Sequence, residues 1–374
     1  MFIAHPPLFA ALWTAVLWTV TALGALEPSP GGPMVAVLLL LPWLHMVTAV
    51  GLFLLLVRNI NNRTLQVLML IQIGLGMYRP DTVAMGFVSE PKQPSAAVSL
   101  STWNLALLGT GQQHKEWRCN QDDAERAAAA TLRQNNADVL VLLEISASRL
   151  DYLKRDLKLT CEQTDYFGTG DSQESGLAVC VRQDSQWEIT RDRKLELPEE
   201  WTYVFAELST REDSPTVINV LGIHLKPLGI TTEKLSPVLK SSPKQWAHGL
   251  TPLLQEMSTS AQIQWDQADR IREQVETGFK DPTVIAGDFN ATPDSAIHYR
   301  FRRSFSDAWE QVGWGIGATR KVGLLPLRID YIYTTNEVTT LEVDTFDCFC
   351  NPSQRCSDHR GVSSQLSIQT TETR

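Results

Sequence analysis

The sequence predicts an α/β fold of packed sheets and covering helices, preceded by an apolar N-terminal region. Short apolar or alternating runs recur from residue 97 onward, and helical patterns separate several of them. This alternation is typical of layered domains in which helices lie outside the sheets. The first 57 residues, in contrast, contain no lysine or arginine. At 374 residues the chain is long enough for one large domain and a smaller region.

The N-terminal region, residues 1–79, is predicted to be a membrane anchor. Its three apolar stretches are residues 8–26, 34–57 and 64–78. The first two are long enough to cross a bilayer as helices. The third lies between Arg63 and Arg79 and is short, so two interpretations fit: it crosses with snorkelling arginines, or it lies in the interface. We therefore expect two or three transmembrane helices.

The distribution of arginines predicts the orientation of this anchor. Arg58 and Arg63 flank the loop after the second stretch, whereas the first loop carries only Glu27. The positive-inside tendency places the arginine-flanked loop in the cytoplasm. If the third stretch crosses, the remaining chain lies outside; if it does not, the remaining chain is cytoplasmic. We favour a multi-pass membrane protein with an extracytoplasmic soluble domain.

Cysteine content and charge narrow the possibilities further. The six cysteines all follow residue 100, and their spacing fits no familiar zinc motif. An even count permits disulfides in an oxidising compartment, although reduced buried thiols fit equally well. Residues 1–80 carry a net charge of +2, which leaves −11 for the remainder of a chain whose total is −9. An acidic domain lacks the broad positive field of a non-specific nucleic-acid binder.

The soluble domain is predicted to span residues 97–370, after a polar linker at 80–96. Strands are expected at residues 97–105, 138–144, 176–181, 204–208, 217–224, 284–290, 328–333 and 361–368, and helices at 122–136, 148–159 and 260–278. Residues 225–259 are rich in proline and lysine. We interpret them as a solvated loop insertion; contact with anionic lipid head groups is the alternative.

Polar side chains stand where several of these buried strands end. The set consists of Asn104, Glu144, His224, Asp288, Asn290, Asp330, Asp358 and His359. Asp288 and Asn290 lie two residues apart and therefore share one side of the strand. Each residue alone has a structural explanation, such as a turn or a solvated strand end. Together, these strand ends would converge in one cleft of a layered sheet.

The set is chemically consistent with a phosphoryl substrate. Glu144 and Asn104 offer the few oxygen ligands that Mg²⁺ accepts, and Mn²⁺ would fit the same ligands. Asp288 can orient or deprotonate a water, and Asn290 can donate to a developing negative charge. His224 and His359 can carry protons near neutral pH. A carboxylate such as Asp330, bonded to the second nitrogen of His359, would favour its imidazolium form.

The order of short motifs resembles the endonuclease/exonuclease/phosphatase superfamily, which includes DNase I-like nucleases, neutral sphingomyelinases and inositol polyphosphate 5-phosphatases. The motifs, in order, are Thr-Trp-Asn104, Asp-Val-Leu-Val-Leu-Leu-Glu144, Ser-Gly-Leu-Ala178, Gly-Ile-His224, Gly-Asp288-Phe-Asn290-Ala-Thr-Pro, Arg-Ile-Asp330-Tyr-Ile and Ser-Asp358-His359. Each is short, but seven in the same order cover roughly residues 97–370. The resemblance implies a four-layered α/β sandwich, DNase I-like, that hydrolyses phosphoesters.

The resemblance also implies a role for each site residue. Glu144 would be the principal metal ligand, with Asn104 assisting and Asp358 beside the metal. Asp288 would activate the water, and Asn290 would position the water or the phosphate. Both histidines would contact the scissile phosphate, with His359 paired to Asp330, and Asp307 would have a supporting role. In two places the chain departs from the pattern: Leu-Ala-Leu follows Asn104, and Arg360-Gly361 follows His359.

We therefore expect a membrane-anchored, Mg²⁺-dependent enzyme that hydrolyses a phosphomonoester or a phosphodiester by direct attack of an activated water. The apolar anchor, the acidic domain and the insertion at residues 225–259 favour a lipid-linked phosphate as substrate. The departure after Asn104 argues against abasic-site nucleases, so a membrane-anchored nuclease is a less favoured alternative. A non-catalytic binding module on the same fold is the second alternative. The sequence predicts neither the individual substrate nor an oligomeric state.

Overall fold

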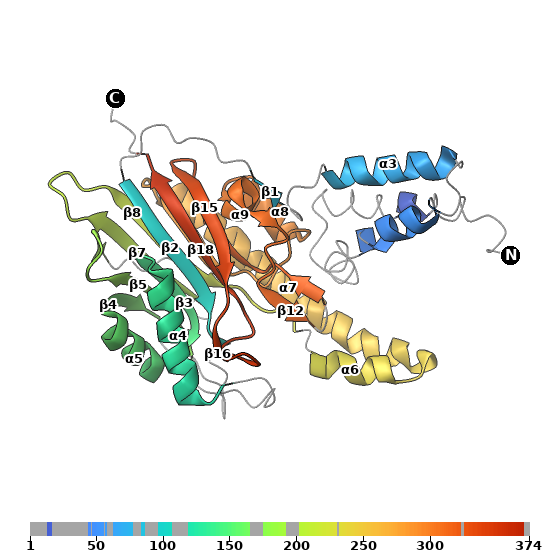
Figure 1. Cartoon of the computed structure of the whole chain (residues 1–374), viewed down its shortest axis with the longest axis horizontal. Coiled ribbons are helices and arrows are strands. Elements are labelled where there is room, and N and C mark those ends of the chain that lie inside the picture. The colour runs from blue at the N-terminus through green and yellow to red at the C-terminus, as the bar shows by residue number, and fades with distance from the viewer. Residues whose placement is uncertain are drawn as a thin grey trace. The chain divides into compact units, whose positions relative to one another are not determined.

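The computed structural model describes residues 13–16, 44–45, 47–55, 57, 63–77, 84–86, 96–106, 119–164, 175–191, 202–229, 232–322 and 325–369. The chain divides into two compact units. The larger unit comprises Ala84–Pro227, Asp266–Asn290 and Phe301–Arg374, and the smaller unit comprises Met1–Val83, Leu228–Trp265 and Ala291–Arg300. The long strands all belong to the larger unit (Figure 1).

The larger unit contains two six-stranded mixed sheets. In the first sheet the order is β15 (Val338–Phe346), β18 (Gly361–Ile368), β2 (Ala96–Asn104), β3 (Val139–Ile145), β5 (Gly176–Arg182) and β4 (Leu159–Gln163). In the second it is β10 (Ser306–Asp307), β14 (Asp330–Thr334), β9 (Thr283–Asp288), β8 (Val217–His224), β7 (Thr202–Thr210) and β6 (Trp187–Arg191). Each sheet has one parallel pair, β2 with β3 and β8 with β9. The predicted α/β fold is confirmed.

A continuous apolar core lies between the two sheets. Alternate residues of the strands face it, among them Val141 from the first sheet and Val220 and Val284 from the second. All three side chains are at most 1% exposed. Burial of such a side chain contributes on the order of 1.5–3 kcal/mol. The period of two in the strands therefore directs one face of each sheet into a shared core.

Helices cover the outer faces and complete four layers. On the first sheet these are α4 (Gln121–Asn135) and α5 (Ala147–Leu157), which bury Ala128 and Leu150 against Leu142 of β3. On the second sheet, Ile271 and Val275 of α7 (Pro243–Gly278) are buried. Phe279, just after α7, stacks on Phe205 of β7 with ring centroids 5.0 Å apart. Figure 1 shows α4 and α5 side by side on their sheet.

Short elements complete the described chain. They are α8 (Ala296–Arg302), α9 (Ala308–Val312), β1 (Ala84–Met85), β11 (Trp314–Gly315), β12 (Arg320–Val322), β13 (Leu325–Leu327), β16 (Phe349–Asn351) and β17 (Gln354–Arg355). Three two-stranded ribbons form from them: β1 with β11, β12 with β13, and β16 with β17. Strand β1 lies within the predicted linker at 80–96, most of which is outside the described residues.

The third apolar stretch forms the helix α3 (Arg63–Met77) of the smaller unit. The described residues of the first two stretches are also helical. Among the residues that the structure describes, no helix has both the length and the apolarity needed to cross a membrane. Most of stretch 8–26 and about half of stretch 34–57 lie outside those residues.

The prediction of a loop insertion at residues 225–259 was wrong. The segment forms α6 (Thr232–Lys240) and the first half of α7. Its prolines suggested a loop because proline lacks an amide hydrogen and disfavours a helix interior. However, Pro243 is the first residue of α7, a position that suits proline. Further along α7, Met257 and Ala261 are buried four residues apart, which is the helical spacing.

Disulfides pair all six cysteines: Cys119–Cys350, Cys161–Cys180 and Cys348–Cys356. Cys161 and Cys180 lie opposite each other on β4 and β5. The other two bonds hold the β16–β17 ribbon, which immediately precedes residues 357–359. The disulfide interpretation of the even cysteine count is therefore the correct one.

Candidate active site

The predicted site residues gather where strands of both sheets end. Asn104 is the last residue of β2, and Glu144 is next to last in β3. In the second sheet, His224 and Asp288 end the parallel strands β8 and β9 and lie opposite each other in the register. Asp330, the first residue of β14, is the antiparallel partner of Asp288. The two parallel pairs thus bring carboxylates, an amide and an imidazole to one end of the layered domain.

The backbone at these strand ends has unusual conformations. Glu144 and Asn290 both have φ of 49°, in the left-handed region that non-glycine residues rarely occupy. Gly287 has φ of 148°, and a Cβ atom on it would lie 1.9 Å from the carbonyl oxygen of Ile223. Only glycine therefore fits before Asp288. Backbone strain of this kind is typical of functional sites, where surrounding structure maintains it.

Asn104 connects the two sheets across the site. Its Nδ2 donates to Glu144 Oε1 at 2.9 Å and to Asp288 Oδ2 at 3.1 Å. Its Oδ1 accepts a hydrogen bond from the backbone N–H of Ala106. The second oxygen of Asp288 accepts from the backbone N–H of Asn290 at 2.8 Å, and Asn290 Nδ2 donates to the carbonyl of Leu225. Both oxygens of Asp288 are therefore held in position.

Two histidines face the same oxygen of Asp288. The Nε2 atoms of His224 and His359 each lie 3.7 Å from Asp288 Oδ2. His224 Nε2 is also 3.6 Å from Glu144 Oε1. The other ring nitrogen of His359, Nδ1, lies 2.9 Å from Asp330 Oδ2. The Asp330–His359–Asp288 arrangement thus places one imidazole between two buried carboxylates.

Burial and charge shift the protonation of these groups. Burial disfavours the charged form of His359, but the carboxylates of Asp330 and Asp288 outweigh it and raise the pKa to about 9. His359 is therefore cationic at neutral pH. Burial raises the pKa of Asp288, and the negative charge of Asp330 raises it further, against the opposing effect of both histidines. Asp288 is thus a stronger base than an exposed aspartate.

Hydrogen bonds from the first sheet fix the loop that carries His359. Ser357 Oγ donates to the carbonyl of Asn104 at 2.7 Å and accepts from the backbone N–H of His359 at 3.0 Å. Trp103 Nε1 donates to the carbonyl of His359 at 3.2 Å. Ser357 and Trp103 were not among the predicted site residues, although both belong to motifs that carry predicted ones.

Arg320, on β12, is a site residue that the sequence did not predict. Its Nη2 donates to Asp358 Oδ2 at 3.1 Å, so the predicted metal-site residue Asp358 is ion-paired. Burial opposes the charge of Arg320, but Asp358, Asp288, Glu144 and Asp330 together raise its pKa. No apolar period or motif distinguishes Arg320 in the sequence, which explains why it was missed.

Asp307 contributes to structure at the start of α9. It accepts from the backbone N–H of Trp309 and so caps that helix. Its other oxygen accepts from Arg328 at 2.6 Å, within a pair that is almost fully buried. The arginine of the Arg-Ile-Asp330 motif thus supports the strand whose first residue contacts His359.

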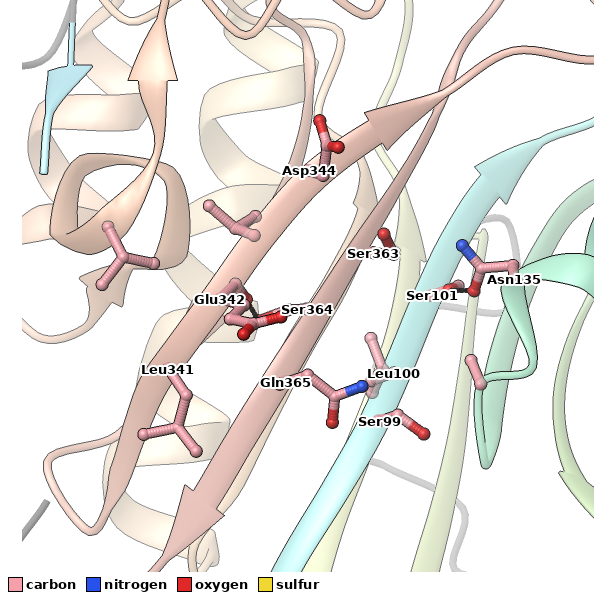
Figure 2. Close-up of a pocket in the computed structure, with 13 residues that line it drawn as sticks. Ser99, Leu100, Ser101, Asn135, Leu341, Glu342, Asp344, Ser363, Ser364 and Gln365 are labelled. Carbon is pink, nitrogen blue, oxygen red and sulfur yellow. Dashed lines mark hydrogen bonds between the residues drawn. The ribbon is translucent and has the colours of Figure 1, made fainter. Parts of the chain in front are cut away.

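A separate groove of about 380 Å³ lies along β2, β18 and β15 (Figure 2). Its polar lining includes Ser99, Ser101, Asn135, Glu342, Asp344, Ser363, Ser364 and Gln365. On one side of the groove, Ser101 Oγ donates to Asn135 Oδ1. Among the described residues that line this groove there is no histidine and none of the predicted site residues. The candidate active site is therefore at the strand ends.

The fold and the site define a DNase I-like α/β protein. Over residues 101–359, which are well over half of the chain, the sequence matches the Endonuclease/Exonuclease/phosphatase family. The chain belongs to this family, and membership indicates hydrolysis of phosphoester bonds. No curated protein sequence matches the chain at a significant level.

Solved structures share this fold. TDP2 from D. rerio in complex with a single-strand DNA product has a TM-score of 0.51 and 16% identity, covering 73% of this chain and 100% of that one. An endonuclease/exonuclease/phosphatase from Bacteroides vulgatus has a TM-score of 0.51 and 14% identity, covering 74% and 100%. At these identities the likeness shows the fold alone.

Proposed function

We propose that this protein is a membrane-anchored, divalent-metal-dependent phosphoesterase in which Asp288 activates a water that attacks phosphorus directly. The observation that carries the proposal is the position of Asp288. Its carboxylate is fully buried, bonded to Asn104 and the Asn290 backbone, and approached by two histidines. Among the described residues of the site, none is a serine or cysteine placed as a nucleophile beside a histidine side chain, so attack by water is the simpler scheme.

Each side chain has a defined task in the proposed reaction. Asp288 accepts a proton from the attacking water, which its raised pKa favours. As the water oxygen bonds to phosphorus, the P–O ester bond breaks, and the leaving oxygen takes a proton from solvent to form the alcohol. His359 is held cationic by Asp330 and donates Nε2–H toward a phosphoryl oxygen. His224 contacts the same group from the opposite sheet, and Asn290 orients the water. These fixed charges and donors stabilise the charge that develops on phosphorus oxygens in the transition state.

The donor set of the site fits a hard divalent cation. Asp288, Asp330 and His359 lie close enough together to hold a metal ion. However, the carboxylates beside His359 raise its pKa to about 9, and the imidazolium form that they favour competes with metal coordination. We assign the cation instead to Glu144, assisted by Asn104 with its side-chain amide reoriented and by Asp358, a set of oxygens that suits Mg²⁺, and Mn²⁺ also. The cation would neutralise charge on a phosphoryl oxygen.

Replacing Glu144 by glutamine will weaken Mg²⁺ binding by roughly 10- to 100-fold, because the site loses its principal anionic oxygen. Calorimetric titration with MgCl₂ measures this directly, and EDTA should abolish hydrolysis by the wild type. Glu342→Gln, an exposed residue of β15 with the same change of charge, is the control and should bind Mg²⁺ normally. Equal affinity in both variants would overturn the metal assignment.

The substrate we propose is a lipid-linked phosphate. The apolar stretches before residue 79 and the net charge of −11 on the remainder support it over nucleic acid. A nuclease is the second candidate, because a protein of similar fold, TDP2 from D. rerio, has been solved with a single-strand DNA product. A panel of lipid phosphates, sphingomyelin, inositol phosphates and plasmid DNA, with and without EDTA, separates the two. Salt-sensitive cleavage of DNA alone would favour the nuclease.

We also propose that the larger unit faces an extracytoplasmic compartment. Support comes from the three disulfides that pair every cysteine, since such bonds persist mainly in oxidising compartments. We expect an alkaline phosphatase fused after residue 374 to be enzymatically active. A green fluorescent protein fused at the same position should not fluoresce. The reverse pattern would place the unit in the cytoplasm. A fusion after residue 60 should give the opposite result and serves as the control.

A further inference from the structure

We propose that Arg320 binds the phosphoryl group of the substrate and is a determinant of phosphate affinity in this site. The inference deepens the proposed function and rests on it. Three observations support it: the backbone of Arg320 is fixed against His359, its guanidinium has unused donors, and it stands among carboxylates of the site.

The backbone around Arg320 is tied to both members of the His359–Asp330 pair. Arg320 forms a β-bridge with His359, and the carbonyl of Thr319 accepts from the N–H of Arg360 at 2.7 Å. The buried Thr319 Oγ1 accepts from the backbone N–H groups of Ile329 and Asp330, at 3.2 Å each. Arg320 is therefore positioned by the same elements that position the imidazolium.

The guanidinium of Arg320 is only partly used. In the described part of the chain, Asp358 is the one acceptor it bonds, through Nη2. Its side chain is 33% exposed, so solvent or a ligand can reach the remaining N–H groups. A guanidinium presents donors in a planar fork that matches two oxygens of one phosphate. Asp358 thus holds the fork in place while leaving donors for a substrate.

The negative charge of the site is the third observation that supports a role for Arg320 in binding phosphate. The site gathers the carboxylates of Glu144, Asp288, Asp330 and Asp358, which would repel an anionic substrate. Arg320 forms an ion pair with one of these four, Asp358. Together with the cationic His359, it offsets part of that negative charge.

The adjacent Lys321 provides a matched control. It follows Arg320 in β12, and successive side chains of a strand point to opposite faces. Lys321 is exposed and carries the same charge. Comparing Arg320→Gln with Lys321→Gln therefore separates a directed contact from a general loss of positive charge. Arg320→Lys retains the positive charge but lacks the planar guanidinium donors, so it tests whether two-point hydrogen bonding to phosphate is needed.

The experiment measures binding of inorganic phosphate by calorimetry in the presence of Mg²⁺, using the full-length protein in detergent, together with kcat and KM for p-nitrophenyl phosphate and its bis-ester. We expect Arg320→Gln to weaken phosphate binding by roughly 10- to 100-fold, the usual effect of losing a charged hydrogen bond. Arg320→Lys should recover part of this loss, and Lys321→Gln should remain within about twofold of the wild type.

The outcomes distinguish this inference from the proposed function. If the wild type hydrolyses a phosphoester but Arg320→Gln and Lys321→Gln bind phosphate equally well, the role of Arg320 is wrong and the proposed function stands. If the wild type hydrolyses none of the panel, the proposed function fails, and tight phosphate binding lost in Arg320→Gln would still identify an anion site. Should Arg320→Gln not fold by thermal melting, Arg320→Lys binding phosphate like the wild type would overturn the inference.

Discussion

Asp288→Asn will lower kcat by roughly 10³- to 10⁴-fold, the range expected when a general base is removed. Asparagine has nearly the same shape, and its Oδ1 can still accept from the backbone N–H of Asn290, where Asp288 Oδ1 accepts at 2.8 Å. It cannot accept a proton from water. Steady-state kinetics on the best substrate of the panel measure the loss.

We expect Asp288→Asn to remain about as stable as the wild type although it loses activity. Burial disfavours the charged carboxylate of Asp288, as its raised pKa shows, and a neutral amide avoids that cost. The hydrogen bond that Asn104 Nδ2 donates to Asp288 Oδ2 is lost, which opposes this gain, so the melting temperature should stay within a few degrees of the wild type. Asp344→Asn, an exposed residue of β15, is the control and should keep full activity. Wild-type kcat in Asp288→Asn would remove Asp288 from the mechanism.

We expect the rate of hydrolysis to depend on pH through the protonation of His359. His359 has a pKa of about 9, so its cationic form predominates below that pH and is lost above it. If hydrolysis requires the imidazolium, kcat/KM will fall as pH rises through about 9. The acidic limb should reflect Asp288, whose raised pKa moves it upward from the ordinary aspartate range. Because these groups interact closely, the apparent pKa read from each limb of the pH profile belongs to the coupled groups together and not to one residue.

Asp330→Asn should move the basic limb to lower pH. Asp330 is the largest influence that raises the pKa of His359, so without it the pKa falls from about 9 as burial favours the neutral imidazole. At pH 8 the variant would then lose activity by roughly 10²-fold, while the loss at pH 6 would be smaller. An unchanged basic limb would show that His359 does not act as the cation. His359→Gln should remove the limb altogether.

The central strands and their polar ends were predictable from the sequence because burial imposes a simple pattern on them. The run Val284-Ile285-Ala286 leads through Gly287 to Asp288, and the register of β8 and β9 places His224 opposite it. Such strands are buried on both faces and are therefore apolar, so an acid at the end of one is easy to recognise in the sequence. Strand β15, in contrast, lies at a sheet edge and reads Val-Thr-Thr-Leu-Glu-Val-Asp-Thr-Phe. Apolar and polar residues alternate only weakly in this sequence, so β15 was not predicted.

Other features depend on contacts that no local pattern contains. Arg320 joins the site because β12 reaches His359 from 39 residues away in sequence, a tertiary pairing. The partner of each cysteine is likewise set by the fold, since six cysteines allow many connectivities. In α7, tertiary packing of residues such as Met257 outweighs the cost of Pro252 inside the helix. Local propensity therefore failed where long-range contacts decided the outcome.

The place of β18 between β15 and β2 has a consequence for biosynthesis. This strand follows His359 directly, and Trp103 contacts His359 across 256 residues of sequence. A nascent chain that still lacks residues 357–368 has an interior gap in one sheet and no imidazolium opposite Asp288. Domains with such distant pairings fold slowly and late. The candidate site is therefore complete only after β18 has been inserted into its sheet.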